Sequence, residues 1–208
     1  MHEPVNNYAR QVENARAYFH TLDFDAMCAR LGLTPTPEGL DIRFLGRPHR
    51  VLRADGRVLD ADGRPASFGA AMAIYDLLGR TGDPPRLRGE FVPITALHGI
   101  RGTQAVHEDL NDPAAQRFAG RADALERALI ARGGRRWGKG DVSYIIDVFD
   151  FFPVCVRFWD ADEEFPASLQ FLWDANALDF LYYETLWYVM AELLERLTET
   201  IQNGERLT

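Results

Sequence analysis

The chain has 208 residues, of which 47% are hydrophobic and 26% are charged, a composition typical of a soluble globular protein with one sizeable core. Its net charge of −8 and its pI near 5.1 argue against nucleic-acid binding, which usually needs a basic surface. No apolar run approaches the roughly 20 residues that span a bilayer, and the first residues lack the pattern of a secretory signal. We therefore expect a cytoplasmic protein that binds neither nucleic acid nor membrane.

The first 66 residues predict two helices and then a set of short strands. Hydrophobic residues at three- and four-residue intervals predict a helix over residues 5–19. Asp23 and Gly32 suit the two caps of a shorter second helix. Alternating polarity predicts a strand over residues 40–45. The Asp55-Gly56 turn predicts that residues 50–53 and 58–59, on its two sides, form a β-hairpin.

The middle of the chain, residues 67–140, predicts helices separated by a loop. Ser67 suits the N-cap of a helix that stops near Gly79. Residues 81–104 have little regular period, which predicts a long ordered loop. Asp112-Pro113 supplies a helix start, and the hydrophobic spacing after it predicts one helix that continues to Gly133.

The C-terminal segment, residues 141–203, predicts strands over residues 142–149, 154–159 and 168–173 and a long amphipathic helix from about Leu178. Helices and strands do not alternate strictly along the chain. We therefore predict a single α+β domain with a largely antiparallel mixed sheet and helices packed against it. Its parts are the helices and hairpin of residues 1–66, the helical and loop middle, and this C-terminal unit.

Four carboxylates lie between the last two predicted strands, in the sequence Asp160-Ala161-Asp162-Glu163-Glu164-Phe165-Pro166. Such a cluster repels itself, so a fold that keeps it together needs cations, arginines or water around it. One interpretation is a solvated turn with Phe165 inserted in the core. The other is a binding surface or site, in which Asp160, Asp162 and Glu164 are candidate ligands of a divalent cation.

Other side chains of the same segment are candidates for a site beside the acidic cluster. Trp159 and Trp173 flank it and would wall a pocket, and Asp174 follows the second strand. Glu184 lies near the edge of the apolar stripe of the last helix, where we expect it to be half-buried. Residues 141–208 carry 3 Lys+Arg against 14 Asp+Glu, which suits a basic partner or a cation.

Metal and redox motifs are lacking in the sequence. Cys28 and Cys155 form no CxxC pair, so we expect no iron–sulfur cluster within this chain. The five histidines form neither HxH nor HExxH, so the usual spacing of a zinc site is missing. The cofactor, if one is used, stays unknown at this point.

The residues 158–167, with the sequence FWDADEEFPA, resemble a family catalogued as domain of unknown function 3786. Phe171-Leu172-Trp173-Asp174 and Glu184 extend the likeness, with Ala161 where the family usually has Gly and Trp173 where it has Phe. The resemblance implies no assigned activity. It implies an association with iron–sulfur or corrinoid-related proteins of anaerobic organisms, which would be separate proteins here.

Two functions follow as hypotheses. The first is an accessory module that binds a small ligand or a partner protein through the acidic-aromatic surface of Trp159, Asp160, Asp162, Glu163 and Glu164 with Trp173, Asp174 and Glu184. The alternative is an enzyme in which clustered carboxylates hold a divalent metal or exchange protons. The sequence does not decide whether the protein is an enzyme, and a purely structural turn with the function elsewhere stays open.

Overall fold

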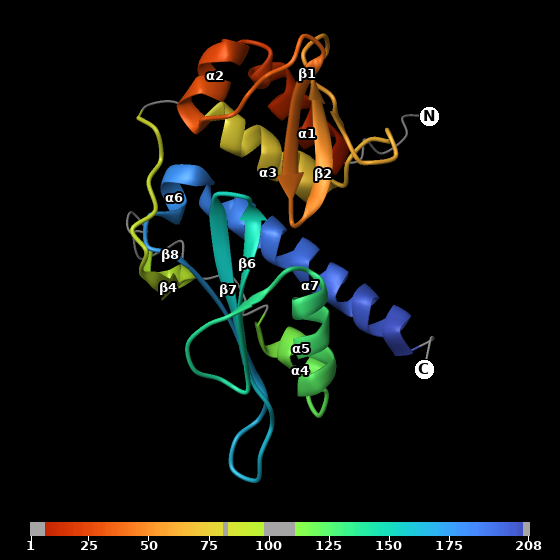
Figure 1. Ribbon diagram of the computed structural model, residues 1–208, viewed down its shortest axis with the longest axis vertical. Helices are drawn as coiled ribbons and strands as arrows, with labels where there is room; N and C mark the ends of the chain where they lie inside the picture. The colour runs from red at the N-terminus through yellow and green to blue at the C-terminus, as the bar shows by residue number, and fades with distance from the viewer. Residues whose placement is uncertain (1–6, 81–82, 98–110, 206–208) are drawn as a thin grey trace.

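The structure is a computed structural model that describes residues 7–80, 83–97 and 111–205. Within these residues the chain forms two antiparallel sheets and seven α-helices, which confirms the predicted α+β class. Figure 1 shows one sheet with α1, α2 and α3 above, the larger sheet with α4 and α5 below, and α7 running past both. None of the helices in the described ranges is long and apolar enough to cross a membrane.

The upper sheet has the order β1-β2-β3, and three helices cover it. Its strands are β1 (Gly39–Phe44), β2 (Arg47–Leu52) and β3 (Val58–Leu59), and its helices are α1 (Asn7–Phe19), α2 (Phe24–Leu31) and α3 (Phe68–Gly79). The predicted caps are confirmed. The Asp23 carboxylate accepts hydrogen bonds from two backbone amides at the start of α2, Gly32 ends that helix with φ 66°, and the Ser67 hydroxyl accepts from Ala70 N.

A two-residue turn, Leu45-Gly46, joins β1 to β2 and touches the lower sheet. Both residues have positive φ, 48° and 76°, as a type I′ hairpin turn requires. Leu45 is the non-glycine residue in this strained region, which costs a side chain about 1–2 kcal/mol. Its amide donates to the carbonyl of Val148 at 2.8 Å, and its side chain is buried, so contacts with the lower sheet hold the turn in place.

The lower sheet has the order β4-β8-β7-β6-β5, with every neighbouring pair antiparallel. Its strands are β4 (Phe91–Pro93), β5 (Arg135–Arg136), β6 (Val142–Phe149), β7 (Phe152–Trp159) and β8 (Ser168–Asp174). The sequence analysis predicted the three long strands. It missed the edge strands β4 and β5. The antiparallel pairing agrees with the predicted, largely antiparallel sheet.

The helices of the lower half are α4 (Asn111–Phe118), α5 (Ala122–Ala131), α6 (Ala177–Phe180) and α7 (Tyr183–Glu205), and a 3₁₀ turn spans Ile94–Ala96. The single helix expected between Asp112 and Gly133 is wrong, because the chain breaks it at Gly120, where φ is 70°. The predicted N-terminal helix begins at residue 7 in the described chain. Part of the predicted loop, residues 81–82 and 98–104, lies outside the described residues.

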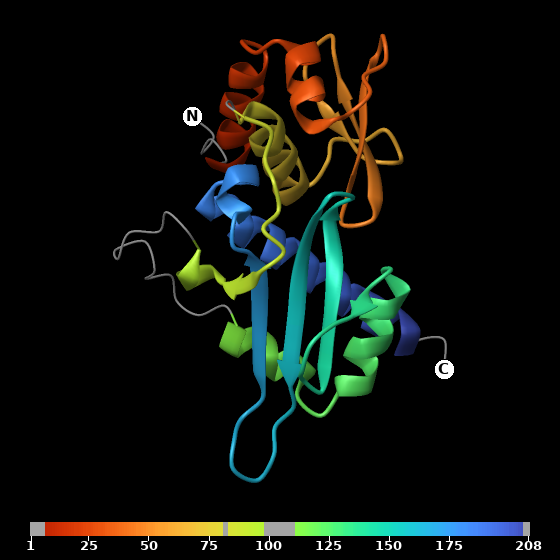
Figure 2. The same cartoon turned by 60° about the vertical axis from the view of Figure 1, so that its left-hand side comes forward.

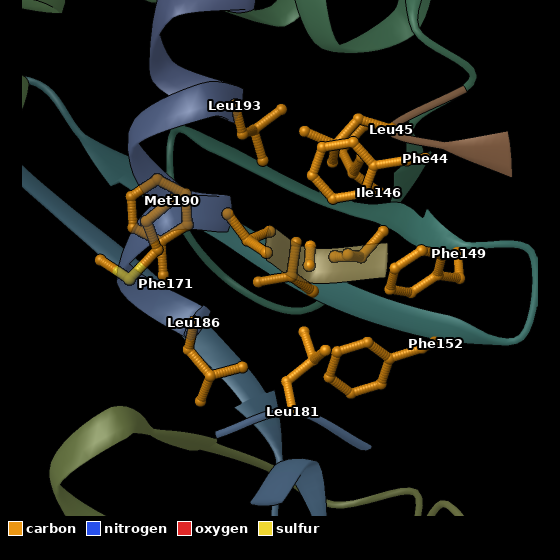
Figure 3. Packing of buried hydrophobic residues seen from close by; sticks show 14 of the residues in the cluster. Phe44, Leu45, Ile146, Phe149, Phe152, Phe171, Leu181, Leu186, Met190 and Leu193 are labelled. Carbon is orange, nitrogen blue, oxygen red and sulfur yellow. The ribbon is translucent and has the colours of Figure 1, made fainter. Parts of the chain in front are cut away.

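The core lies between α7 and the lower sheet and continues upward past the Leu45-Gly46 turn. Figure 3 shows Leu186 and Met190 of α7 lying against the side chains of the sheet. It also shows Leu193 beside Phe44 and Leu45, so one helix packs on parts of both sheets. Because apolar burial stabilises by about 25 cal/mol per Å², this shared core ties the two halves into one domain.

Candidate functional site

The acidic cluster forms the tip of the β7–β8 hairpin, which extends past the rest of the sheet (Figures 1 and 2). Residues 161–166 are all exposed, and Phe165 leaves 66% of its surface to solvent. The expectation that Phe165 inserts in the core is therefore wrong. An aromatic ring stands instead at the end of a protruding loop, next to Glu163 and Glu164.

Asp162 shapes this tip with its carboxylate. Its Oδ1 atom accepts hydrogen bonds from Glu164 N at 2.8 Å and from Phe165 N at 2.7 Å, and its own amide donates to the Phe165 carbonyl at 3.0 Å. Hydrogen bonds from the two backbone amides lower the pKa of Asp162. The side chain is thus a turn-forming residue that fixes where Phe165 and its neighbours lie.

Asp160 anchors the base of the hairpin loop to the rest of the lower half. Its Oδ1 accepts from Gly120 N and from Ala161 N, each at 2.8 Å, and its amide donates to Asp141 Oδ2 at 2.8 Å. Gly120 is the residue that separates α4 from α5. The hydrogen bond from Gly120 to Asp160 therefore fixes the base of the acidic loop relative to the break between α4 and α5.

The carboxylates of the tip do not converge on a metal site. No group of three or more histidine, cysteine, aspartate or glutamate side chains is placed to hold a metal ion in the part of the chain that the structure describes. Glu163 and Glu164 are exposed and form no ion pair with any described residue. These two side chains and Phe165 are the groups that the tip presents outward.

Trp159 and Trp173 lie on opposite faces of the sheet, so they do not wall one pocket. Trp159 of β7 pairs with Ser168 of β8, and Trp173 of β8 pairs with Val154 of β7. Side chains alternate between the two faces along a strand, so Val154 and Trp159, five positions apart on β7, lie on opposite faces. Trp173 lies on the same face as its partner Val154. Trp159 is half-buried and lies 5.5 Å from the guanidinium of Arg157, which also lies 5.7 Å from the Trp137 ring. Trp173 is fully buried and stacks on Phe152 at 5.8 Å.

Asp174 and Glu184 also lie away from the tip, at the other end of β8. Asp174 is 1% exposed, and its carboxylate accepts from Arg88 N at 2.9 Å, Gly89 N at 2.7 Å and Asn176 N at 2.9 Å. It holds the segment before β4 against the end of β8. Glu184 is exposed at the start of α7, so the expectation of a half-buried side chain is wrong.

A second group of polar side chains, which the sequence analysis missed, lines a pocket of about 400 Å³ at the junction of β2, α3 and α7. We call this the junction pocket. Its polar lining includes Arg47, His49, Asp60, Ser67, Glu192 and Arg196. The residues come from four separate parts of the chain, so they form no motif that can be recognised in the sequence.

His49 is the histidine of the junction pocket, and it is 5% exposed. Its Nδ1 lies 3.0 Å from the Arg47 carbonyl oxygen, which can only accept, so Nδ1 carries the proton and Nε2 is the lone-pair nitrogen of the neutral ring. Burial lowers the pKa of His49, and the charge of Arg196 adds to this, against the opposing effects of the hydrogen bond to the Arg47 carbonyl and of Asp60 and Glu192. The neutral imidazole is the form favoured at neutral pH.

Glu192 and Arg196 form the other side of the junction pocket. Arg196 donates from Nε and Nη2 to Glu192 Oε1, at 3.0 and 2.7 Å, and from Nη1 to the carbonyls of Phe44 and Leu45. The Ser67 hydroxyl donates to Glu192 Oε2 at 3.0 Å. The signal available in the sequence was an arginine on the apolar side of a helix, four residues after a glutamate.

The profile of the family described as "Domain of unknown function (DUF3786)" matches residues 23–196. That range includes the acidic tip, the junction pocket and all the described strands of both sheets. Neither a curated protein nor a solved structure matches the chain. With the family profile covering well over half of its length, the chain belongs to the DUF3786 family.

Proposed function

We propose that this protein is a binding module that docks a partner protein through the tip of the β7–β8 hairpin. The observation that carries the proposal is the exposed Phe165, with 66% of its surface open, held at the end of a loop directly after two exposed glutamates. A large aromatic side chain that is exposed on such a loop contributes little to the stability of the fold. It can gain free energy when a partner covers it, since aromatic anchors dominate many interfaces.

The tip is fixed before any partner arrives. Asp162 holds the turn with two hydrogen bonds from backbone amides, and Asp160 ties the loop base to Gly120. A preorganised loop loses less conformational entropy on binding than a flexible one, so more of the contact energy appears as affinity.

The charge of the tip defines the chemistry of the partner. Glu163 and Glu164 directly precede Phe165, and residues 141–208 carry 14 acidic against 3 basic side chains. The partner that fits is a protein surface with lysine or arginine around a hydrophobic pocket that takes one phenyl ring. The family resemblance implies an association with iron–sulfur or corrinoid-related proteins, so such redox proteins are the first candidates for that partner.

The experiment places a photoreactive phenylalanine analogue at position 165 in the native host and identifies the cross-linked protein by mass spectrometry. The partner is then purified, and its affinity is measured for the native chain and for Phe165→Ala. We expect the variant to bind about tenfold or more weakly, as loss of an aromatic anchor usually costs at least 1.4 kcal/mol. Glu163→Gln with Glu164→Gln should mainly slow association, and the effect should vanish at high salt.

The matched control is a pair of changes outside the tip. Leu87→Ala removes another exposed hydrophobic side chain, and Glu195→Gln neutralises an exposed acid on α7. Both should leave the affinity unchanged. Equal affinity of Phe165→Ala and the native chain for the cross-linked protein would overturn the proposal, as would cross-linking that yields no defined partner.

A second candidate function is acid–base catalysis at the junction pocket. It is favoured by the buried neutral His49, whose Nε2 is available as a base, in a pocket shared with Asp60, Ser67 and Glu192. A base with a lowered pKa next to carboxylates is a common arrangement at catalytic sites. The adjoining pocket of about 430 Å³ shares His49 and Asp60, so a substrate of moderate size would fit beside the ring.

Imidazole NMR tests this second candidate, because His49 can be followed in a ¹⁵N-labelled protein while small acids, esters and amides are screened. A substrate must shift the His49 Nε2 resonance, and His49→Gln must abolish its turnover while the chain stays folded. Turnover that survives in His49→Gln would exclude the base role. Binding at the hairpin tip is unaffected by this variant, so the two candidates are separable.

A further inference from the structure

A small pocket beside α3 contains an aspartate that the candidate sites above do not use. The pocket has a volume of about 140 Å³ and lies where α1, α3 and the start of α7 meet. Its lining includes Tyr18, Met72, Tyr75, Asp76, Tyr182 and Thr185. Most of this wall is aromatic or aliphatic, with a single carboxyl group in it.

Asp76 is 9% exposed, and its two oxygen atoms differ in their contacts. Oδ2 accepts a hydrogen bond from Tyr182 N at 2.6 Å. Oδ1 is buried and has no hydrogen-bond partner among the residues that the structure describes. A buried carboxylate oxygen left in this state costs free energy that a donor at the same position would recover.

No described side chain supplies that donor. The positive charge of Arg80 acts on Asp76, but the two residues form no ion pair, and the Arg80 guanidinium lies 4.3 Å from the centroid of the Tyr182 ring. The Tyr75 hydroxyl donates to the Gly56 carbonyl at 2.6 Å, so this side chain offers its ring rather than its hydroxyl. Glu184, at the start of α7, adds negative charge close to Asp76.

We propose that this pocket binds a small alkylammonium ion, with its ammonium group beside the Asp76 carboxyl group and the alkyl part lying against the tyrosine rings and Met72. A carboxylate within aromatic walls is the arrangement that recognises organic cations, since rings attract a cation through their faces. A divalent metal fits less well, because it takes several oxygen ligands and only one carboxylate lines the pocket.

The size of the pocket limits the ligand. A water molecule occupies about 30 Å³ in the liquid, so a volume of 140 Å³ admits a few non-hydrogen atoms. A propylammonium ion is of this size, whereas a long polyamine would have to extend into solvent. The protonation of Asp76 supports the assignment, because burial raises the pKa of Asp76 to about 6 and a bound cation would lower it again.

The test titrates the native chain with propylammonium chloride and follows the ¹³C resonance of the Asp76 carboxyl group. We expect a saturable shift, and we expect affinity to rise as the pH passes upward through about 6, since the cation binds the ionised carboxylate. Propanol, which is neutral and of the same size, should bind at least about tenfold more weakly. A flat pH profile, or equal binding of propanol, would overturn the proposal.

Variants separate this site from the exposed acids nearby. Asp76→Asn keeps an oxygen for Tyr182 N but removes the charge, and it should lose at least about tenfold in propylammonium affinity. Asp179→Asn neutralises an exposed carboxylate on α6 and should bind as the native chain does. If Asp76→Asn proves unfolded, the pH profile and the propanol comparison on the native chain decide alone. Undiminished binding by a folded Asp76→Asn would refute the site.

Discussion

Glu192 and Arg196, one turn apart on α7, form an ion pair that is almost enclosed, with 14% and 5% of their side-chain surfaces exposed. Arg196 also donates to the carbonyls of Phe44 and Leu45 at the strained turn between β1 and β2. The pair thus connects the last helix to the upper sheet. A buried charge that loses its partner is strongly destabilising, whereas an exposed pair contributes little.

We predict that Arg196→Met lowers the free energy of unfolding by about 3–5 kcal/mol, because it leaves Glu192 buried without a cation and two carbonyls without a donor. Urea denaturation measures the change. The matched control is Arg50→Met, which breaks the Arg50–Asp41 pair, whose side chains are 53% and 57% exposed. That loss should stay within about 1 kcal/mol. Similar losses in both variants would contradict the role given to the buried pair.

Asp174→Ala should release the segment before β4. Three backbone amides, those of Arg88, Gly89 and Asn176, lose their acceptor together, which we expect to cost about 3 kcal/mol. Hydrogen exchange at Arg88 and Gly89 should accelerate far more than exchange within α7. Asp150→Ala, at a carboxylate with 66% of its side chain exposed, is the control and should change neither. Unchanged exchange at Gly89 in Asp174→Ala would contradict the prediction.

Asp76 should make the protein less stable as the pH rises. Its folded-state pKa, about 6, lies above the ordinary value of 3.8, so the folded chain holds the proton more tightly than the unfolded chain. The free energy of unfolding then falls between pH 3.8 and about 6, by on the order of 3 kcal/mol. Asp76→Asn should lack this component in denaturation at several pH values. A variant with the native pH slope would show that Asp76 is not the group responsible.

His49 should act in the opposite direction. Burial lowers its pKa below the ordinary 6.5, so the unfolded chain binds the proton more tightly, and stability is lost as the pH falls below 6.5. His49→Gln should lose less stability than the native chain on acidification, as followed by thermal denaturation. His20→Gln, at an exposed histidine, is the control. If the two variants showed the same pH dependence, burial of His49 would not be the cause.

Phe165 should contribute almost nothing to folding. Phe165→Ala, at a ring that is 66% exposed, should change the free energy of unfolding by no more than about 0.5 kcal/mol. Phe158→Ala, at a fully buried ring of the same hairpin, should cost about 3–5 kcal/mol. Chemical denaturation of both variants makes the comparison. A large loss in Phe165→Ala would mean that the ring serves the fold rather than a partner.

The parts of the fold that sequence reasoning predicted are those encoded by neighbouring residues. Caps such as Asp23 and Ser67 and the spacing of apolar residues in α7 are local signals, and each is confirmed, although α7 begins at Tyr183 and not near Leu178, which lies in α6. The strand β4 was missed because three residues carry no period, and it exists through pairing with β8. The break at Gly120 depends on a hydrogen bond to Asp160, which is 40 residues away.

The sites show the same limit. The acidic loop was found because its carboxylates adjoin in the sequence, but its exposure depends on how far the hairpin extends. The junction pocket was missed because Arg196 meets Phe44 across 152 positions. Asp76 lies in the middle of an apolar helix. The sequence does not show whether such an acid is ion-paired, fully hydrogen-bonded or, as here, buried with one oxygen that has no described partner.

The helix α7 is the last element in chain order, and it lies against α3 above and α5 below. During synthesis, both sheets and their helices therefore leave the ribosome before the element that covers them. Until residues near Leu197 emerge, the apolar sides of α3, α5 and the lower sheet stay uncovered. Synthesis of α7 should therefore be the step that closes the shared core, and the complete fold should form late.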